Sequence, residues 1–146
     1  MKGLAYVLGI TAGFGLALQV GMNAQLRKVL QSANAAALIS FLVGTAALLA
    51  LLLVTRVALP TRDSIAAVPA WAWFGGLFGA FYVAISTIVA SELGAASLLA
   101  LALVGQLTMA LVVDHFGWLG LPVNPITFTR LAGVALLGIG VWLVTR

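Results

Sequence analysis

Two side-chain amides, Gln19 and Asn23, lie in residues 9–26, a segment inside the first apolar stretch of the chain. Residues four apart share one face of a helix. The amides therefore continue a stripe of small and polar side chains, formed by Thr11, Gly15, Gln19 and Asn23. Amides exchange hydrogen bonds with other polar groups and carry no charge. Because such a stripe must face protein or water rather than lipid, it predicts either a polar cavity or a hydrogen-bonded helix contact.

Four further polar side chains lie deep in other apolar stretches and extend this candidate lining. The full set is Gln19, Asn23, Ser40, Tyr82, Ser86 and Gln106. An uncharged lining favours a polar neutral, zwitterionic or amphipathic solute over a bare cation. The alternative for the amides is interhelical bonding, which contributes roughly 0.6–2 kcal/mol per hydrogen bond in a bilayer. The alternative for Tyr82 is that the aromatic face of its helix contacts lipid or fills space.

The titratable residues do not form a catalytic or metal-binding set. A hydrolase or transferase needs a nucleophile with a base in reach, or a metal with its ligands. The chain has one histidine, His115, and its neighbour Asp114 points about 100° away on a helix. The other carboxylates, Asp63 and Glu92, lie at the ends of apolar stretches, and cysteine is absent. We therefore expect no enzymatic activity, no metal and no cofactor.

The composition indicates an integral membrane protein. Of the 146 residues, 64% are apolar and 7% are charged, and the mean hydropathy is +1.22. A water-soluble domain of this size does not sustain such values. The net charge of +4 comes from Lys and Arg that are scattered at segment ends. This pattern fits contact with lipid headgroups and argues against nucleic acid as a partner.

Five apolar stretches are long enough to cross a bilayer. They cover residues 4–26, 33–54, 71–90, 95–113 and 126–144, and Arg130 is the one charged residue inside them. Each approaches or exceeds the roughly 20 residues that span about 30 Å of hydrocarbon. Because the bilayer requires an internally bonded backbone, we expect an all-α fold of five transmembrane helices in a single membrane domain, residues 1–146. The first stretch exceeds a signal-peptide core of about 7–15 residues, so we expect it to be retained.

Small residues and short connections predict how these helices pack. Glycines at helical spacing let helices approach closely, and we assign this role to Gly9, Gly13, Gly75, Gly79, Gly133 and Gly138. Residues 61–64 are expected to form a turn or a short interfacial segment, and residues 91–94 a tight turn. Asp114 and Arg130 flank the connection before the last helix. We expect them to anchor at headgroups or to pair with each other, with a gating ion pair as the alternative.

The positive charges are almost evenly shared between the two sides of the membrane. One side holds Lys2, Arg56, Arg62 and Arg130, and the other holds Arg27, Lys28 and Arg146. Since an excess of Lys and Arg on the cytoplasmic side sets topology, a chain without that excess can insert in both orientations. Two oppositely inserted copies would form an antiparallel homodimer of ten helices, the arrangement that many transporters encode as an inverted repeat. The alternative is one fixed orientation.

Several short motifs are spread over the whole chain: Gln19 and Asn23 within residues 15–26, and residues 40–45 (SFLVGT), 75–83 (GGLFGAFYV), 93–96 (LGAA), 105–107 (GQL), 114–117 (DHFG) and 125–133 (PITFTRLAG). In these motifs the chain resembles the bacterial YdcZ family of the drug/metabolite transporter superfamily. It implies a five-helix protein of the bacterial inner membrane, related to half of a ten-helix transporter and occurring as dual-topology homodimers, oppositely oriented pairs or fused duplications. It implies no substrate. The chain departs from the family pattern at Glu92, where a basic residue is common.

Two functions from different classes follow. The first is a secondary transporter in which an antiparallel dimer moves a small solute through a midplane cavity by alternating access. The second is a non-transporting membrane subunit that pairs with another half-transporter or a partner protein. The related small multidrug resistance exporters use a glutamate in their first helix, and this first stretch has none. Proton–cation exchange at such a carboxylate is therefore not predicted.

Overall fold

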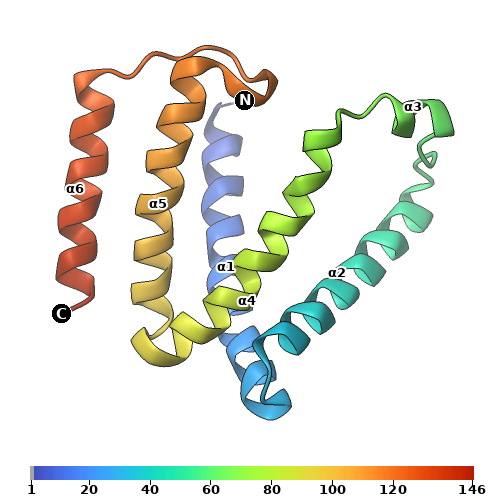
Figure 1. Cartoon of the computed structure of the whole chain (residues 1–146), viewed down its shortest axis with the longest axis horizontal. Helices are drawn as coiled ribbons and strands as arrows, with labels where there is room; N and C mark the ends of the chain where they lie inside the picture. Colours follow the sequence, from blue (N-terminus) through green and yellow to red (C-terminus); the bar gives the residue numbers. More distant parts are fainter. Residues whose placement is uncertain (1) are drawn as a thin grey trace. The chain divides into compact units, whose positions relative to one another are not determined.

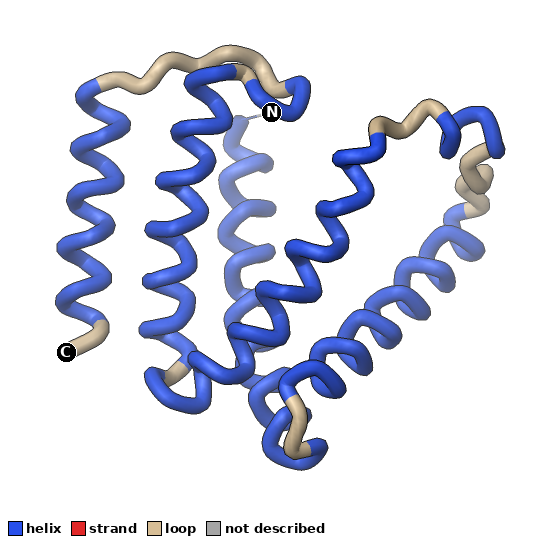
Figure 2. Tube along the Cα trace, viewed as in Figure 1, coloured by secondary structure: helices blue, strands red, loops and turns tan. Residues whose placement is uncertain are grey.

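The structure is a computed structural model that describes residues 2–146 (Figure 1). Within that range the chain is helical apart from its loops (Figure 2). The elements in order are α1 (Lys2–Leu30), α2 (Ala33–Thr55), α3 (Arg62–Ala66), the 3-10 turn η1 (Ala70–Trp73), α4 (Phe74–Leu93), α5 (Ala95–Phe116), the 3-10 turn η2 (Trp118–Gly120) and α6 (Phe128–Val144). The predicted all-α fold is confirmed.

All five predicted apolar stretches form helices. Among the described residues, four helical spans are long and apolar enough to cross a membrane: Gly3–Leu30, Ala33–Thr55, Ala70–Leu93 and Ala95–Phe116. Helix α6 is apolar but has 17 residues, which corresponds to about 25 Å at 1.5 Å per residue. That length is at the lower end of what spans a bilayer. Leucine, valine and phenylalanine side chains remain exposed over most of the helical surface, as expected where lipid is the solvent.

Helix α1 ends later than predicted, and the expected end at residue 26 is wrong. Arg27 and Lys28 lie in its last turn, where cations interact favourably with the helix dipole. The helix stops where Gln31 adopts a left-handed backbone with φ of 52°. Ser32 then caps α2, because its side chain accepts a hydrogen bond from the Ala35 N–H at 3.2 Å. The positive charges therefore lie inside the last turn of α1 rather than beyond its end.

The boundaries of α5 and α6 also differ from the prediction. Helix α5 continues three residues beyond residue 113 and places Asp114 and His115 in its last turn. It ends at Gly117, whose φ is 62°. Helix α6 begins two residues later than expected, because Thr127 takes the cap position and accepts a hydrogen bond from the Arg130 N–H at 3.3 Å.

The predicted third transmembrane helix is divided at its start. Trp71 and Trp73 lie in the 3-10 turn η1, and α4 begins at Phe74. At its other end α4 runs to Leu93, so the expected four-residue turn is reduced to Gly94 alone, with φ of 81°. The short segment predicted at residues 61–64 is present as α3, capped by the side chain of Thr61.

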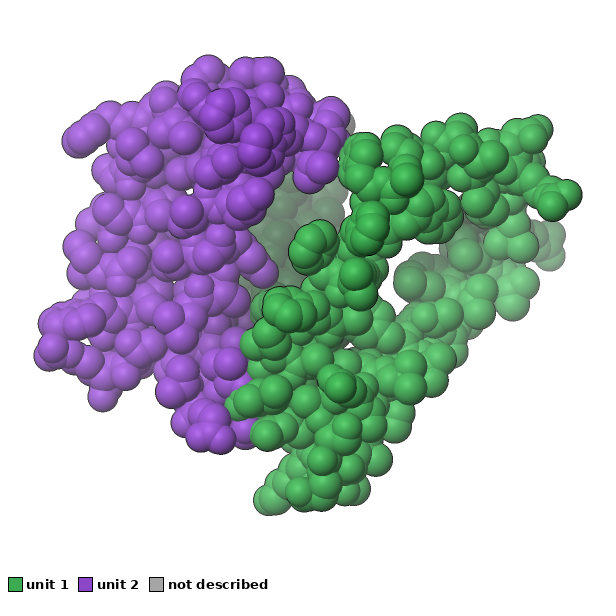
Figure 3. Space-filling view, viewed as in Figure 1, with its two compact units in different colours: residues 1–88 green, residues 89–146 purple. Residues whose placement is uncertain are grey.

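The chain divides into two compact units, Met1–Ile88 and Val89–Arg146 (Figure 3). In the first unit α1 packs on α2, and Val20, Ala36 and Ala37 are among the buried residues of these two helices. Helix α4 approaches α2 at Gly79, where an added Cβ would lie 3.4 Å from the Phe41 ring. In the second unit α5 packs on α6. One undivided membrane domain stays a prediction.

Candidate solute-binding groove

Asn23 and Ser40 lie at the same height of the α1–α2 hairpin. Gln31 and Ser32 connect the two helices. Asn23 lies eight residues before Gln31, and Ser40 lies eight residues after Ser32. Both are therefore about 12 Å from the connection at 1.5 Å per residue. Gln19 lies one helical turn deeper on the same face of α1. The hairpin thus brings three of the six predicted lining residues together near the middle of a bilayer about 30 Å thick.

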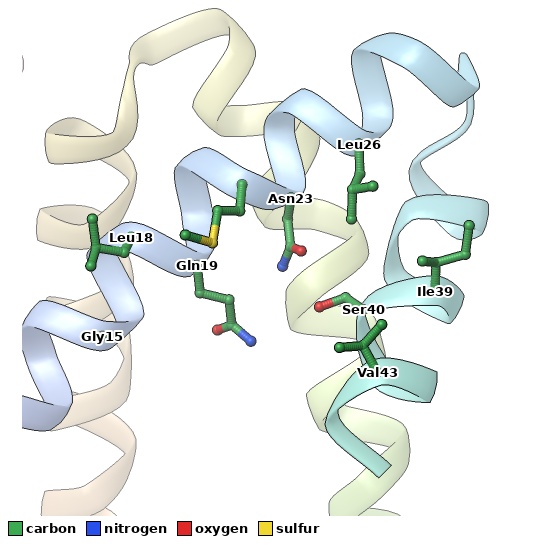
Figure 4. A pocket seen from close by; sticks show the side chains of 9 residues that line it. Gly15, Leu18, Gln19, Asn23, Leu26, Ile39, Ser40 and Val43 are labelled. Atoms are coloured by element: carbon green, nitrogen blue, oxygen red, sulfur yellow. The ribbon is translucent and has the colours of Figure 1, made fainter. Parts of the chain in front are cut away.

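These three side chains line a groove between α1 and α2 with a volume of about 460 Å³. Figure 4 shows the amides of Gln19 and Asn23 pointing from α1 into the space in front of Ser40 on α2. The complete lining is Gly15, Leu18, Gln19, Met22, Asn23, Leu26, Ile39, Ser40 and Val43. The volume falls in the range of sites that hold small organic molecules.

Hydrogen-bond partners for the three polar side chains are absent within residues 2–146. The hydroxyls of Thr11 and Thr108 donate to backbone carbonyls of their own helices, at 2.9 and 2.8 Å, as serine and threonine inside helices commonly do. Ser40 makes no such bond among the described residues, and neither amide of Gln19 or Asn23 is paired there. Asn23 is 3% exposed and lines the groove, so the groove is where its amide is accessible. In hydrocarbon an unpaired polar group costs several kcal/mol, so water or a solute in the groove would supply the missing partners.

Apolar side chains form the walls of the groove. Leu18, Met22 and Leu26 come from successive turns of α1, and Ile39 and Val43 come from α2. These apolar residues were not predicted as lining. Their spacing of four residues along each helix is the pattern that places them beside the amides. Two further hollows continue the groove. One of about 210 Å³ shares Gln19 and Ser40, and one of about 490 Å³ shares Met22 and Leu26.

Tyr82 and Ser86 belong to α4 and are not among the residues that line this groove. The Ser86 hydroxyl is buried and donates to the Val83 carbonyl of its own helix at 2.8 Å. The Tyr82 hydroxyl is buried and has no hydrogen-bond partner within the described part of the chain. The predicted contribution of both residues to a solute cavity stays a prediction.

Gln106 belongs to the second unit, where its side chain is exposed on α5. Its predicted place in the same cavity stays a prediction.

The glycines assigned to packing differ in their surroundings. Gly79 faces Phe41, whereas Gly9, Gly13, Gly75, Gly133 and Gly138 have no atom within 4 Å of an added Cβ. Close helix contact at these five open positions stays a prediction.

Asp114 and Arg130 pair with each other across the α5–α6 connection. The Arg130 guanidinium donates to the Asp114 carboxylate and, at 2.9 Å, to the carbonyl of Asn124. The Asn124 N–H in turn donates to the Asp114 carbonyl at 2.8 Å. These bonds form a clasp, defined here as Asp114, Asn124 and Arg130, that holds the connection against the end of α5. Whether the pair serves as an anchor or as a gate stays a prediction.

His115 and Gly117 reinforce this clasp, and neither role was recognised in the sequence. The Nδ1 atom of His115 accepts a hydrogen bond from the Ile126 N–H at 3.2 Å. Gly117 has φ of 62°, and a Cβ there would come within 2.7 Å of the Val123 side chain. Only glycine therefore fits this left-handed position without displacing its neighbour. The Gly-rich composition of residues 117–120 was the available signal.

Comparisons with known proteins agree with the membrane fold. Residues 4–143 match the family described as "Putative inner membrane exporter, YdcZ". The chain is 29% identical over 137 residues to the inner membrane protein YdcZ of Escherichia coli K12, an alignment that covers 94% of this chain and 91% of that relative. No solved structure matches the chain.

An exporter family is a class of transport proteins and not a class of enzymes. The expected location in the bacterial inner membrane, with several helices able to span it, is confirmed by the relative and by the apolar helices. The family match covers nearly the whole chain, including the α1–α2 groove. The chain therefore belongs to the YdcZ family of the drug/metabolite transporter superfamily, and it is a transporter-type protein of the inner membrane.

Proposed function

We propose that this chain is a secondary transporter that binds a small polar or amphipathic solute in the α1–α2 groove. The observation that carries the proposal is the convergence of Gln19, Asn23 and Ser40, which have no partners within the described chain, on one groove. A protein that only needed to pack its helices would pair these groups with each other or replace them by apolar side chains. In a transporter these groups stay unpaired within the protein, because they hydrogen-bond to the solute when it is bound and to water when it has left.

The transporting unit that we propose is an antiparallel homodimer of ten helices. The near balance of Lys and Arg between the two membrane sides supports insertion in both orientations. The open glycine positions on α1, α4 and α6 support close contact with a second chain. In such a dimer the second copy closes the groove, and rocking of one copy against the other exposes the solute to each side in turn. Tyr82, Ser86 and Gln106 are proposed as further lining of the closed cavity.

Loss of one amide from the groove tests the transport function. The wild type, Gln19→Leu and Thr108→Val would be expressed in a bacterium that lacks its major exporters and challenged with a panel of growth-inhibiting neutral and amphipathic compounds. We expect the wild type to protect against at least one compound, and Gln19→Leu to lower its efflux rate by about tenfold, as for one lost hydrogen bond of about 1.4 kcal/mol. Thr108→Val is the matched control, because its hydroxyl is already bonded within α5.

The same experiment separates transport from a subunit without transport activity. A scaffold that only positions a partner protein would give no protection with any compound, or equal protection with Gln19→Leu. Either result contradicts the proposal, provided that immunoblots show equal amounts of the three proteins in the membrane. Assembly should be unchanged in Gln19→Leu, because the amide has no partner within the described chain.

A further inference from the structure

The chemistry of the groove restricts the charge of the solute. None of its nine lining residues is ionisable, and the lining of the adjoining hollows contains no ionisable residue either. A second copy adds no charge at this depth, because Arg130 is the only charged residue inside the five apolar stretches and lies near the start of the last one. An ion that entered the groove would lose its hydration without gaining a counter-charge. The site therefore disfavours cations and anions alike.

The polar groups of the groove require a solute head group that both donates and accepts hydrogen bonds. The amides of Gln19 and Asn23 each carry an NH₂ donor and a carbonyl acceptor, and the Ser40 hydroxyl does both. A head group that only accepts, such as a ketone, would leave the two amide carbonyls unsatisfied in an apolar surrounding. A carboxamide or an alcohol satisfies both kinds of group without carrying charge.

The walls of the groove require an apolar body next to that head group. Leu18, Met22 and Leu26 of α1 face Ile39 and Val43 of α2 on either side of the amides. The hollow that shares Met22 and Leu26 continues along α1 past Gln25 and Val29 to Leu30. An alkyl chain bound there would bury apolar surface against leucine, valine and a methionine side chain, which adapts to different shapes.

We propose that the groove binds uncharged amphiphiles, whose amide or hydroxyl head bonds to Gln19, Asn23 and Ser40 and whose alkyl body lies along Met22 and Leu26. This inference rests on the proposed transport function and names its solute class. Asn23 is the most discriminating position, because it is nearly fully buried and its amide has no partner among the described residues. An aspartate at this position would place one negative charge beside the head group and should turn the preference toward cations.

Three probes that each contain eight carbon atoms test this inference. Octanamide, octylammonium and octanoate are neutral, cationic and anionic at neutral pH. Binding of tritiated octanamide to the purified full-length protein in lipid nanodiscs would be measured by scintillation proximity, with the unlabelled compounds as competitors. We expect saturable binding that octanamide and octan-1-ol displace at concentrations about tenfold lower than either charged compound, a difference of 1.4 kcal/mol.

Variants at Asn23 make the result specific to the groove. Asn23→Leu should weaken octanamide binding by about tenfold, Asn23→Asp should bind octylammonium better than octanamide, and Thr108→Val should behave as the wild type. Circular dichroism would verify that each protein is folded. The inference is overturned if a charged compound competes as well as octanamide, if Asn23→Leu binds as the wild type does, or if folded wild type shows no saturable binding.

The outcomes also separate this inference from the proposed function. A protein whose protection of cells depends on Gln19 but which prefers octylammonium is a transporter with a different solute class. A protein that binds octanamide through Asn23 but protects cells against no compound has the proposed binding site but does not transport the tested compounds.

Discussion

Replacement of Asn23 should affect the stability of the protein in opposite ways, depending on whether its amide belongs to a binding site or to a packing contact. If the amide only holds helices together, its loss should cost roughly 0.6–2 kcal/mol. In the structure it is buried without a partner in the described chain. Removing an unsatisfied polar group costs nothing in hydrogen bonds and adds apolar contact. We therefore expect Asn23→Leu to leave the unfolding temperature unchanged or to raise it, measured by circular dichroism in detergent micelles.

Thr87→Val is the matched control for this prediction. Thr87 is equally inaccessible, but its hydroxyl donates to the Ala84 carbonyl at 2.8 Å. Its replacement by an isosteric apolar side chain should lower the free energy of unfolding by about 0.5–1.5 kcal/mol. If Asn23→Leu destabilised the protein as much as Thr87→Val does, Asn23 would be a packing residue and the groove would lose its deepest polar group.

The α5–α6 connection is the element where an anchor and a gate can be told apart. The clasp of Asp114, Asn124 and Arg130 is partly exposed, so its ion pair is weaker than a buried one. We expect Asp114→Asn to lower the free energy of unfolding by about 1–2 kcal/mol, because the bond to the guanidinium loses its charge. Urea unfolding followed by circular dichroism would measure this change.

Transport by the Asp114→Asn protein then separates the two roles. An anchor predicts that the efflux per folded molecule is unchanged, whereas a gate predicts that efflux changes while stability does not. The double exchange of Asp114→Arg with Arg130→Asp should recover most of the stability if the pairing itself is what holds the connection. Failure of the double exchange to recover any stability would show that the backbone bonds of Asn124 hold it instead.

Hydrophobicity predicted where the helices are but not where they end. All five apolar stretches are helical, because the bilayer requires it. The ends depend on local backbone geometry that composition does not reveal: left-handed residues at Gln31 and Gly117, and caps at Ser32 and Thr127. Charged residues marked these ends only to within a helical turn, since Arg27 and Lys28 lie in the last turn of α1.

The polar half of the groove was predictable from the sequence, whereas the apolar half was not. Amides inside an apolar stretch must avoid lipid, which singled out Gln19 and Asn23, and the symmetric position of Ser40 about the connection follows from the hairpin. Leu18 and Ile39 do not differ in type from the many aliphatic residues that face lipid, so only the packing of α1 on α2 identifies them as walls. Tyr82 and Ser86 do not line the α1–α2 groove, and their place in a solute cavity stays a prediction.

At the scale of the whole molecule, the even distribution of positive charge predicts two orientations in one membrane. A reporter at the carboxyl terminus, active only on one side, should give signal from both sides in comparable amounts. Adding two lysines next to Lys28 should shift nearly all copies to one orientation and abolish efflux, because the antiparallel partner would then be missing. Adding two glutamines at the same positions is the control, because it lengthens the chain equally without adding charge. A stable dimer whose reporters all lie on one side would contradict the antiparallel model.

The account depends most on the groove being open to water and solute at the middle of the membrane, and thiol labelling measures this directly. The natural chain has no cysteine, so single variants Gln19→Cys, Ser40→Cys and Leu42→Cys can each be treated with a charged, membrane-impermeant thiol reagent. Leu42 lies two residues from Ser40, on the outer face of α2, and is 59% exposed to what would be lipid. We predict that the reagent modifies positions 19 and 40, that octanamide slows the modification, and that position 42 stays unmodified. If positions 19 and 40 resist the reagent as fully as position 42, the groove is dry packing and the proposed transport pathway is wrong.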